Sequence, residues 1–287
     1  MMNVEQYVEQ VSDLFVLSDS FLRIKELIDD EASTIDDISE VILLDPALVG
    51  TVLKLANSSF FNYPGKIDTI SKAVLVLGIT EVYNLVIAYF TKEAFKKIDA
   101  DSDYLDDFWL KSVDCALLIK FLGTSLHVAN AERLFILGLL HNLGELIVKQ
   151  TSPELLCECE SDDSSVLPWQ KQLQVLGFTF GECSAELLKQ WQLPYSLFAP
   201  IRHQDIDGPS QYNIETQLLY VAKRIMNKNL LLTNSKFQQL VYGDLMAGEI
   251  LSILQLNEEV LSNAVDYCDL ERMGLLSILN PGAAMVY

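Results

Sequence analysis

Apolar residues recur along this chain at the three- and four-residue spacing of amphipathic helices. One such set begins at Ile35, directly after Thr34, and Thr34 with Asp37 forms the pattern of a capping box. Asp45-Pro46 predicts the start of the next helix, with Asp as the cap and Pro at the first helical position. No stretch alternates at period two for long enough to indicate a strand. The pattern therefore predicts an all-α protein.

The pattern also predicts two helical lobes. About five helices are expected in the first hundred residues, including one that ends at Gly78 and one that Thr80 caps. The acidic segment from Asp99 to Asp107 is expected to be a polar linker, which places a lobe boundary near residue 101. The expected lobes are therefore residues 1–101 and 102–287. Further helices are predicted at about 108–123, 130–149, 153–160, 168–177, 179–191 and 194–203, and after 213, where one apolar helix face should complete the second core.

Charge narrows the function classes. The chain has 20 Lys and Arg against 40 Asp and Glu, a formal net charge of −20. Because nucleic-acid affinity depends largely on neutralising phosphates, we expect no binding to DNA or RNA, and no binding to an anionic membrane. The N-terminal sequence MMNVEQYVEQ has no basic residue and no apolar signal core, so a cytoplasmic location is expected. The five scattered cysteines are expected to be reduced thiols.

Several motifs occur in a recognisable order. They are ILLDPALVGTVLKLANSSFFNYPGKIDTISKAVLVLGITEVYNLVIA, FWLKSVDCA, FILGLLHNLGELI, LGFTFGECSAELLKQWQLP and IRHQ. Over about residues 17–204 the chain resembles the HDOD family of bacterial signalling proteins. The resemblance implies an N-terminal helical lobe packed on a degenerate HD phosphohydrolase lobe. It also implies a signalling or regulatory role in which metal-dependent hydrolysis is generally absent.

The residues at the HD metal-site positions test this implication. In HD phosphohydrolases, a His-Asp pair, an earlier His and a later Asp bind a divalent metal that activates water. Here His141 matches the motif histidine, and Asn142 stands in the aspartate position. The earlier histidine falls near Lys111 and the later aspartate near Lys223, while His203 is what remains of a common His pair. We therefore expect a vestigial site with no catalytic residue, metal or cofactor, in which His141 is a neutral core imidazole.

The two lysines leave two alternatives open. The favoured one is that one or both of Lys111 and Lys223 pack their aliphatic stems and extend their ammonium groups into solvent, with the match to the HD ligand positions one turn out of register. The other is that at least one ammonium points into the vestigial site, where it pairs with a buried carboxylate or attracts a phosphate-like anion.

A second candidate region follows the helix that Pro46 begins. Asn57 is expected to end that helix through hydrogen bonds to local backbone, while Phe60, Phe61 and Tyr63 add large apolar area to a loop. These residues form either a plug between the two lobes or an interaction surface. The plug is favoured, because three exposed aromatic side chains would promote aggregation.

These observations favour a non-catalytic HDOD-type signalling module that acts through contacts with other bacterial signalling proteins. Two alternatives remain. One is a divergent metal-dependent phosphohydrolase that uses His141, Asn142 and His203. The other is a sensor that binds a nucleotide or small anion without cleaving it.

Overall fold

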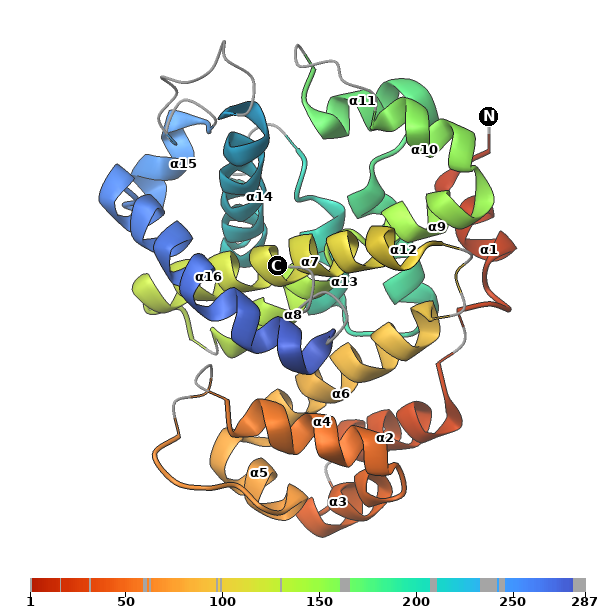
Figure 1. Cartoon of the computed structure of the whole chain (residues 1–287), viewed down its shortest axis with the longest axis vertical. Coiled ribbons are helices and arrows are strands. Elements are labelled where there is room, and N and C mark those ends of the chain that lie inside the picture. The colour runs from red at the N-terminus through yellow and green to blue at the C-terminus, as the bar shows by residue number, and fades with distance from the viewer. Residues whose placement is uncertain are drawn as a thin grey trace. The chain divides into compact units, whose positions relative to one another are not determined.

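The computed structural model of the chain is helical throughout its described part (Figure 1). It describes residues 2–15, 17–30, 32–58, 61, 63–96, 98, 100–129, 131–160, 166–206, 211–232, 242 and 246–280, with residues 132 and 228–232 described by their backbone. These residues contain no β-strand, so the all-α prediction is confirmed. None of the described helices is both long enough and apolar enough to cross a membrane.

The chain divides into two compact units. Unit 1 comprises Met1–Asp13, Ile98–Ala100 and Lys111–Asp269, and unit 2 comprises Leu14–Lys97, Asp101–Leu110 and Leu270–Tyr287. This division differs from the expected lobes 1–101 and 102–287 at both ends of the chain. Met1–Asp13 belongs to unit 1, which holds most of the second expected lobe, and Leu270–Tyr287 belongs to unit 2, which holds most of the first. Long-range packing that a linear reading cannot show accounts for both differences.

Unit 2 is a small group of helices with its own core. Its helices are α2 (Asp19–Asp29), α3 (Ile35–Leu43), α4 (Pro46–Ala56), α5 (Ile70–Leu77) and α6 (Ile79–Phe95), with parts of α7 (Ser102–Ser125) and α16 (Glu258–Leu279). The α6 helix packs against α2, α4 and α5, and α3 packs against α2, α4 and α5. Together with α1, the described residues up to Phe95 form six helices, where about five were expected.

Helix ends in unit 2 largely follow the sequence signals. The Thr34 hydroxyl accepts from the Asp37 amide at 3.2 Å, and the Asp37 carboxylate accepts from the Thr34 amide at 2.8 Å, so the capping box is confirmed. The predicted cap at Thr80 is wrong. Instead, Gly78, with φ of 93°, ends α5 and directly precedes α6 at Ile79. A left-handed φ is accessible to glycine at little cost, which lets the two helices follow each other without a loop.

Unit 1 contains the remaining helices. They are α1 (Val4–Gln10), α8 (Glu132–Leu140), α9 (Leu143–Thr151), α10 (Pro153–Cys159), α11 (Pro168–Leu176), α12 (Phe180–Gln190), α13 (Tyr195–Arg202), α14 (Ile214–Leu232) and α15 (Gly248–Ile253), with parts of α7 and α16. The α12 helix packs against α1, α9 and α13, and α14 packs against α8 and α13.

Contacts with residues far away in sequence hold each end of the chain within its unit. In unit 1, the Tyr7 ring packs edge-on against Phe178 at 5.0 Å, and its hydroxyl lies 3.2 Å from the Ser152 hydroxyl. In unit 2, Lys92 donates to the carbonyl of Leu279 at the end of α16, and the Asn280 amide donates to Asp106 at 2.7 Å. Each end is thus held by side chains far away in sequence.

Two helices differ from the sequence prediction. The expected linker between Asp99 and Asp107 is largely helical, because α7 begins at Ser102, where the Asp101 carboxylate accepts from the Tyr104 amide at 2.8 Å. The α14 helix was expected to bury one face, yet every residue from 215 to 225 is buried. This central helix therefore places polar and charged side chains in the core of unit 1.

Candidate functional site

The run FILGLLHNLGELI, expected within one long helix, is two helices with a break at His141 and Asn142. The α8 helix ends at Leu140, α9 begins at Leu143, and Asn142 adopts φ of −123° and ψ of 18°. The backbone leaves the regular helical path at these two polar residues. The HD-like dipeptide therefore lies at a corner between two buried helices.

His141 is held by hydrogen bonds of its Nδ1 atom and its backbone carbonyl. Its Nδ1 lies 2.6 Å from the Gly138 carbonyl oxygen, and its own carbonyl accepts from the Gln204 amide at 2.8 Å. Next to it, the Gly144 amide donates to the Ser184 hydroxyl at 2.8 Å. The site thus joins the α8–α9 corner to α12 and to the segment after α13.

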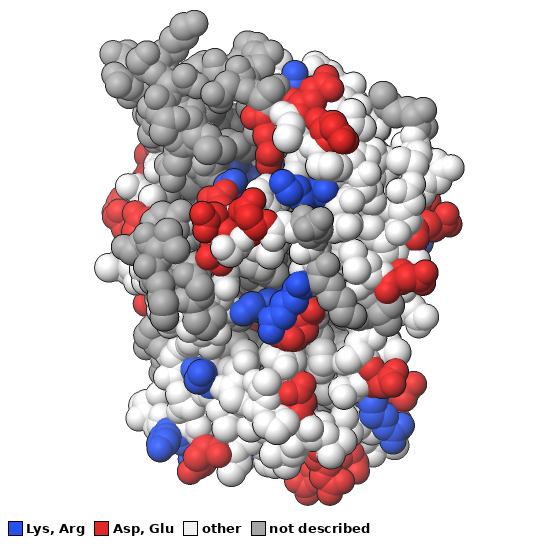
Figure 2. Space-filling view, turned by 45° about the vertical axis from the view of Figure 1, so that its right-hand side comes forward, with Lys and Arg blue, Asp and Glu red and all other residues white. Residues whose placement is uncertain are grey.

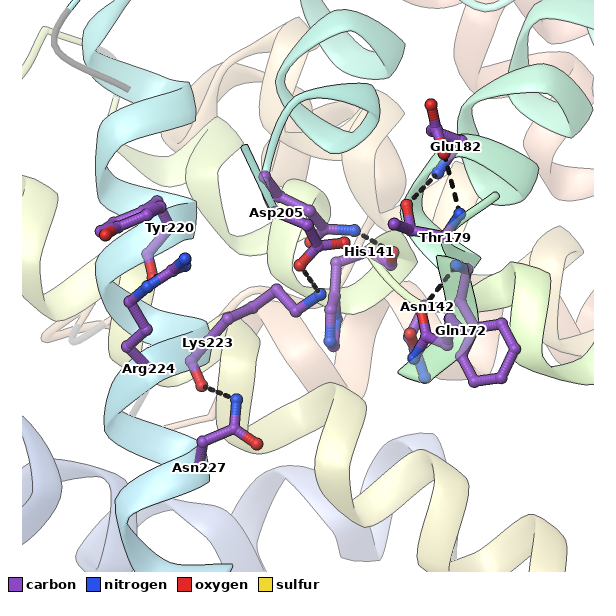
Figure 3. Close-up of polar contacts among 12 residues, drawn as sticks. His141, Asn142, Gln172, Thr179, Glu182, Asp205, Tyr220, Lys223, Arg224 and Asn227 are labelled. Atoms are coloured by element: carbon purple, nitrogen blue, oxygen red, sulfur yellow. Dashed lines mark hydrogen bonds and ion pairs between the residues drawn. The ribbon is translucent and has the colours of Figure 1, made fainter. Parts of the chain in front are cut away.

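The charged member of the site is Lys223 on α14. Its side chain extends toward Asp205 and beside His141 (Figure 3), and its ammonium forms an ion pair with the Asp205 carboxylate. Lys223 is 9% exposed and Asp205 8% exposed, so the pair is buried. The Lys223 ammonium also lies 5.7 Å from the centre of the Trp169 ring. Of the two alternatives for this lysine, the structure shows an ammonium paired with a buried carboxylate.

Burial and charge set the protonation state of His141. Burial, followed by the positive charge of Lys223, lowers the pKa of the imidazole from its ordinary 6.5 to about 3, and the hydrogen bond to the Gly138 carbonyl opposes this shift only in part. His141 is therefore neutral near pH 7, with Nδ1 carrying the proton that it donates to the Gly138 carbonyl.

The other predicted site residues occupy different surroundings. The Lys111 side chain is exposed, as the alternative of a solvent-directed ammonium requires. The Asn142 amide donates to the Glu145 carboxylate one turn away. His203 is half-buried, with Nδ1 2.8 Å from the Ala199 carbonyl and its ring stacked on Tyr212 at 4.7 Å. Only Lys223 is therefore shown to join His141 in one buried cluster.

These donors do not fit a divalent metal. Among the described residues, no three His, Cys, Asp or Glu side chains are grouped so that they could hold a metal ion. Asn142 offers a neutral amide in place of a carboxylate, and the Asp205 carboxylate is engaged by an ammonium. A dication at this position would meet the positive charge of Lys223 in a buried environment, where repulsion between like charges is weakly screened.

Sequence reasoning missed Asp205, Trp169 and Arg224. Asp205 directly follows the motif IRHQ, and this position could have marked it as a site residue. Its burial could not be predicted, because the neighbouring residues in the sequence are mostly polar. The Arg224 guanidinium lies 4.4 Å from the centre of the Trp169 ring and 3.2 Å from that of Tyr220. Two cationic side chains thus lie close to the same indole.

Glycines permit the close helix packing around the site. A Cβ at Gly138 would lie 2.4 Å from the Cα of Ala116, and one at Gly144 would lie 2.2 Å from the Phe180 carbonyl oxygen. A Cβ at Gly181 would lie 2.2 Å from the Gln204 amide nitrogen. The helices near His141 therefore approach one another closely at these three glycines, and the site is part of a packed core.

The second candidate region lies in unit 2. The Asn57 side chain accepts from the Ile67 amide at 2.8 Å and donates to the Ile67 carbonyl at 2.6 Å, which closes the loop between α4 and α5. Tyr63 is 38% exposed and Phe61 is half-buried, while Phe60 lies outside the described residues. Asn57 ends α4, as the sequence indicated. Whether the aromatic residues form a plug between lobes stays a prediction.

The fold and site define an all-helical domain in which the dipeptide His141-Asn142 lies at a corner between two buried helices. The model of the HDOD domain family matches residues 14–206, and the chain belongs to this family. This match confirms the resemblance seen in the sequence.

Solved structures share the fold over nearly the whole chain. A protein from Shewanella amazonensis SB2B, whose name proposes a phosphohydrolase, is 22% identical with a TM-score of 0.69, and the alignment covers 97% of each chain. An HDOD domain protein of unknown function from Geobacter sulfurreducens is 19% identical with a TM-score of 0.66, covering 96% of this chain and 97% of that one. At these identities the likeness shows the fold alone.

One curated relative extends beyond the matched region. An uncharacterised protein from Treponema pallidum (strain Nichols) is 27% identical over 209 residues, which are 71% of this chain. The alignment covers 40% of that protein, so the chain matches less than half of the relative's length.

Proposed function

We propose that this protein is a non-catalytic HDOD signalling module that acts through contacts with other proteins. The observation that carries the proposal is the buried ion pair of Lys223 and Asp205 beside His141. In a metal-dependent hydrolase this position needs free carboxylate and imidazole donors and room for substrate. Here the Lys223 ammonium occupies this position. The surrounding core is closely packed, because a Cβ at Gly138, Gly144 or Gly181 would collide with atoms of neighbouring segments. The remnant therefore serves as a scaffold for the domain.

Metal content and hydrolysis test the non-catalytic part. Protein purified without chelator is expected to contain well below one equivalent of transition metal. Any turnover of phosphomonoesters or cyclic nucleotides with added Mn²⁺ is expected to be the same in His141→Ala. Stoichiometric metal together with turnover that disappears in His141→Ala would reverse the proposal. The interaction part fails if crosslinking in bacterial lysates yields no partner that is reproducibly specific to this chain.

A second candidate function is a sensor of a small anion or nucleotide. It is favoured by three buried polar atoms that have no hydrogen-bond partner among the described residues: Trp169 Nε1, Gln204 Oε1 and Asp205 Oδ2. A ligand with both donors and acceptors would satisfy them, although buried water would do so as well. Thermal-shift measurements with sulfate and nucleotide monophosphates distinguish a bound ligand from bound water. A ligand at 100 times its Kd raises the free energy of unfolding by about 2.7 kcal/mol. A shift that Trp169→Phe removes would support the sensor.

A further inference from the structure

A groove of about 710 Å³ opens on unit 2 beside the loop that joins α4 and α5. Its lining includes Leu53 and Ile67 together with the two lysines Lys54 and Lys66. Both lysines are exposed. The groove therefore combines an apolar surface with two cationic side chains, which is the composition of a peptide-binding site rather than of a metal site.

The positive charges of Lys54 and Lys66 are not neutralised by an ion pair with any described residue. Asp68, the one acidic residue in the lining, lies 3.5 Å from Lys72, which offsets its charge. The groove is thus locally positive in a chain whose formal net charge is −20.

The wall of the groove is already ordered. Asn57 bonds both backbone groups of Ile67, and its amide also donates to the Leu53 carbonyl at 2.7 Å. The Tyr63 ring lies over Gly65, where an added Cβ would stand 2.7 Å from the ring. Because these contacts fix the groove before binding, a partner would not bear the entropy of ordering it.

We propose that this groove binds an acidic peptide segment of a partner protein, with an apolar residue packed near Leu53 and carboxylates placed at Lys54 and Lys66. The inference rests on the proposed protein-contact function and names the chemistry of the partner. Asp and Glu form several separate groups on the face drawn in Figure 2, with Lys and Arg between them. At physiological salt the Debye length is about 8 Å, so an acidic segment in the groove interacts with the nearby lysines more strongly than with distant acidic groups.

Selection from a library of random 12-residue peptides displayed on phage tests the proposal. The bait is the full chain, and the counter-selection uses the double variant Lys54→Gln/Lys66→Gln. Enriched peptides, synthesised with a fluorophore, are then titrated by anisotropy. Arg23→Gln/Lys96→Gln is the matched control, because it removes two exposed positive charges from the same unit.

The expected peptides carry two or more Asp or Glu residues around an apolar residue. Their Kd should rise about tenfold in Lys54→Gln/Lys66→Gln and less than about twofold in the control, since two exposed charge pairs contribute roughly this much. Enrichment of basic or uncharged peptides, no enrichment, or equal binding to all variants would overturn the inference. So would concentration-dependent self-association that the groove variant abolishes, because the occupant would then be a second copy.

Failure here can be told apart from failure of the proposed function. If the groove variant binds normally while crosslinked partners remain specific and hydrolysis is absent, only the groove assignment is wrong. If metal-dependent turnover is found, the non-catalytic function is wrong whatever the groove binds.

Discussion

The ammonium of Lys223 and the carboxylate of Asp205 form a buried ion pair between α14 and the segment that follows α13. Taking two charges out of water is costly, and their mutual attraction offsets this cost only while both are present. The pair therefore makes each partner dependent on the other.

Removing one partner should be far worse than removing both. Lys223→Met is expected to lower the free energy of unfolding by about 3 to 5 kcal/mol, because it leaves Asp205 buried without a counter-charge. Lys223→Met/Asp205→Leu should recover a large part of that loss. Urea denaturation followed by circular dichroism measures the wild type, Lys223→Met, Asp205→Leu and the double variant. Losses that simply add in the double variant would show that the two side chains are not coupled.

His141 should make stability depend on pH. Its pKa is about 3 in the folded protein and about 6.5 when unfolded, so between these values the unfolded chain binds a proton that the folded chain excludes. Stability is therefore full above pH 6.5 and falls as the pH falls. Between pH 6.5 and 5, where few carboxylates titrate, the free energy of unfolding is expected to fall by about 1 to 2 kcal/mol.

The same measurement on His141→Gln should show a much flatter dependence in that window. His203→Gln is the control, because this half-buried ring stacks on Tyr212 outside the buried cluster, and it should keep the wild-type slope. An unchanged slope in His141→Gln would mean that another group causes the effect.

Gly138 should not tolerate a side chain. Gly138→Ala would place a methyl group 2.4 Å from the Cα of Ala116, and separating α7 from α8 should lower the free energy of unfolding by about 1 to 3 kcal/mol. Gly50→Ala in α4, where nothing lies within 4 Å, should instead stabilise by about 0.5 to 1 kcal/mol. Thermal unfolding of both variants gives the comparison. Equal effects at the two glycines would contradict the close packing.

Asn57 should control the order of the loop between α4 and α5. Asn57→Ala removes both side-chain bonds to the Ile67 backbone, and at about 1 kcal/mol for each bond it should cost about 2 kcal/mol. Hydrogen exchange should become faster at the Ile67 amide while the amides of α12 keep their protection. Asn257→Ala, which removes one cap bond to the Val260 amide, should leave exchange at Ile67 unchanged.

Local signals predicted most helix ends, because a cap acts within one turn. Thr34 with Asp37 forms the capping box that their spacing indicated, and the Asp45 carboxylate accepts from the Ala47 and Leu48 amides at the predicted start of α4. Thr80 failed because Gly78 reaches a backbone conformation that lets α6 begin earlier. The break at His141 and Asn142 was missed since the apolar run continues across it without a proline or a helix-ending glycine.

The sequence by itself determined the helical class and the HDOD family, because periodicity and the order of motifs can be recognised along the chain without tertiary contacts. Only the tertiary structure decided what surrounds His141. Lysine stems can pack while their ammonium groups reach water, so the sequence favoured solvent for one or both of Lys111 and Lys223 and did not say which. Lys223 is buried because α14 is enclosed along residues 215–225 and Asp205, eighteen residues earlier, supplies the counter-charge. That pairing depends on where two segments meet in space, which no spacing along the chain specifies.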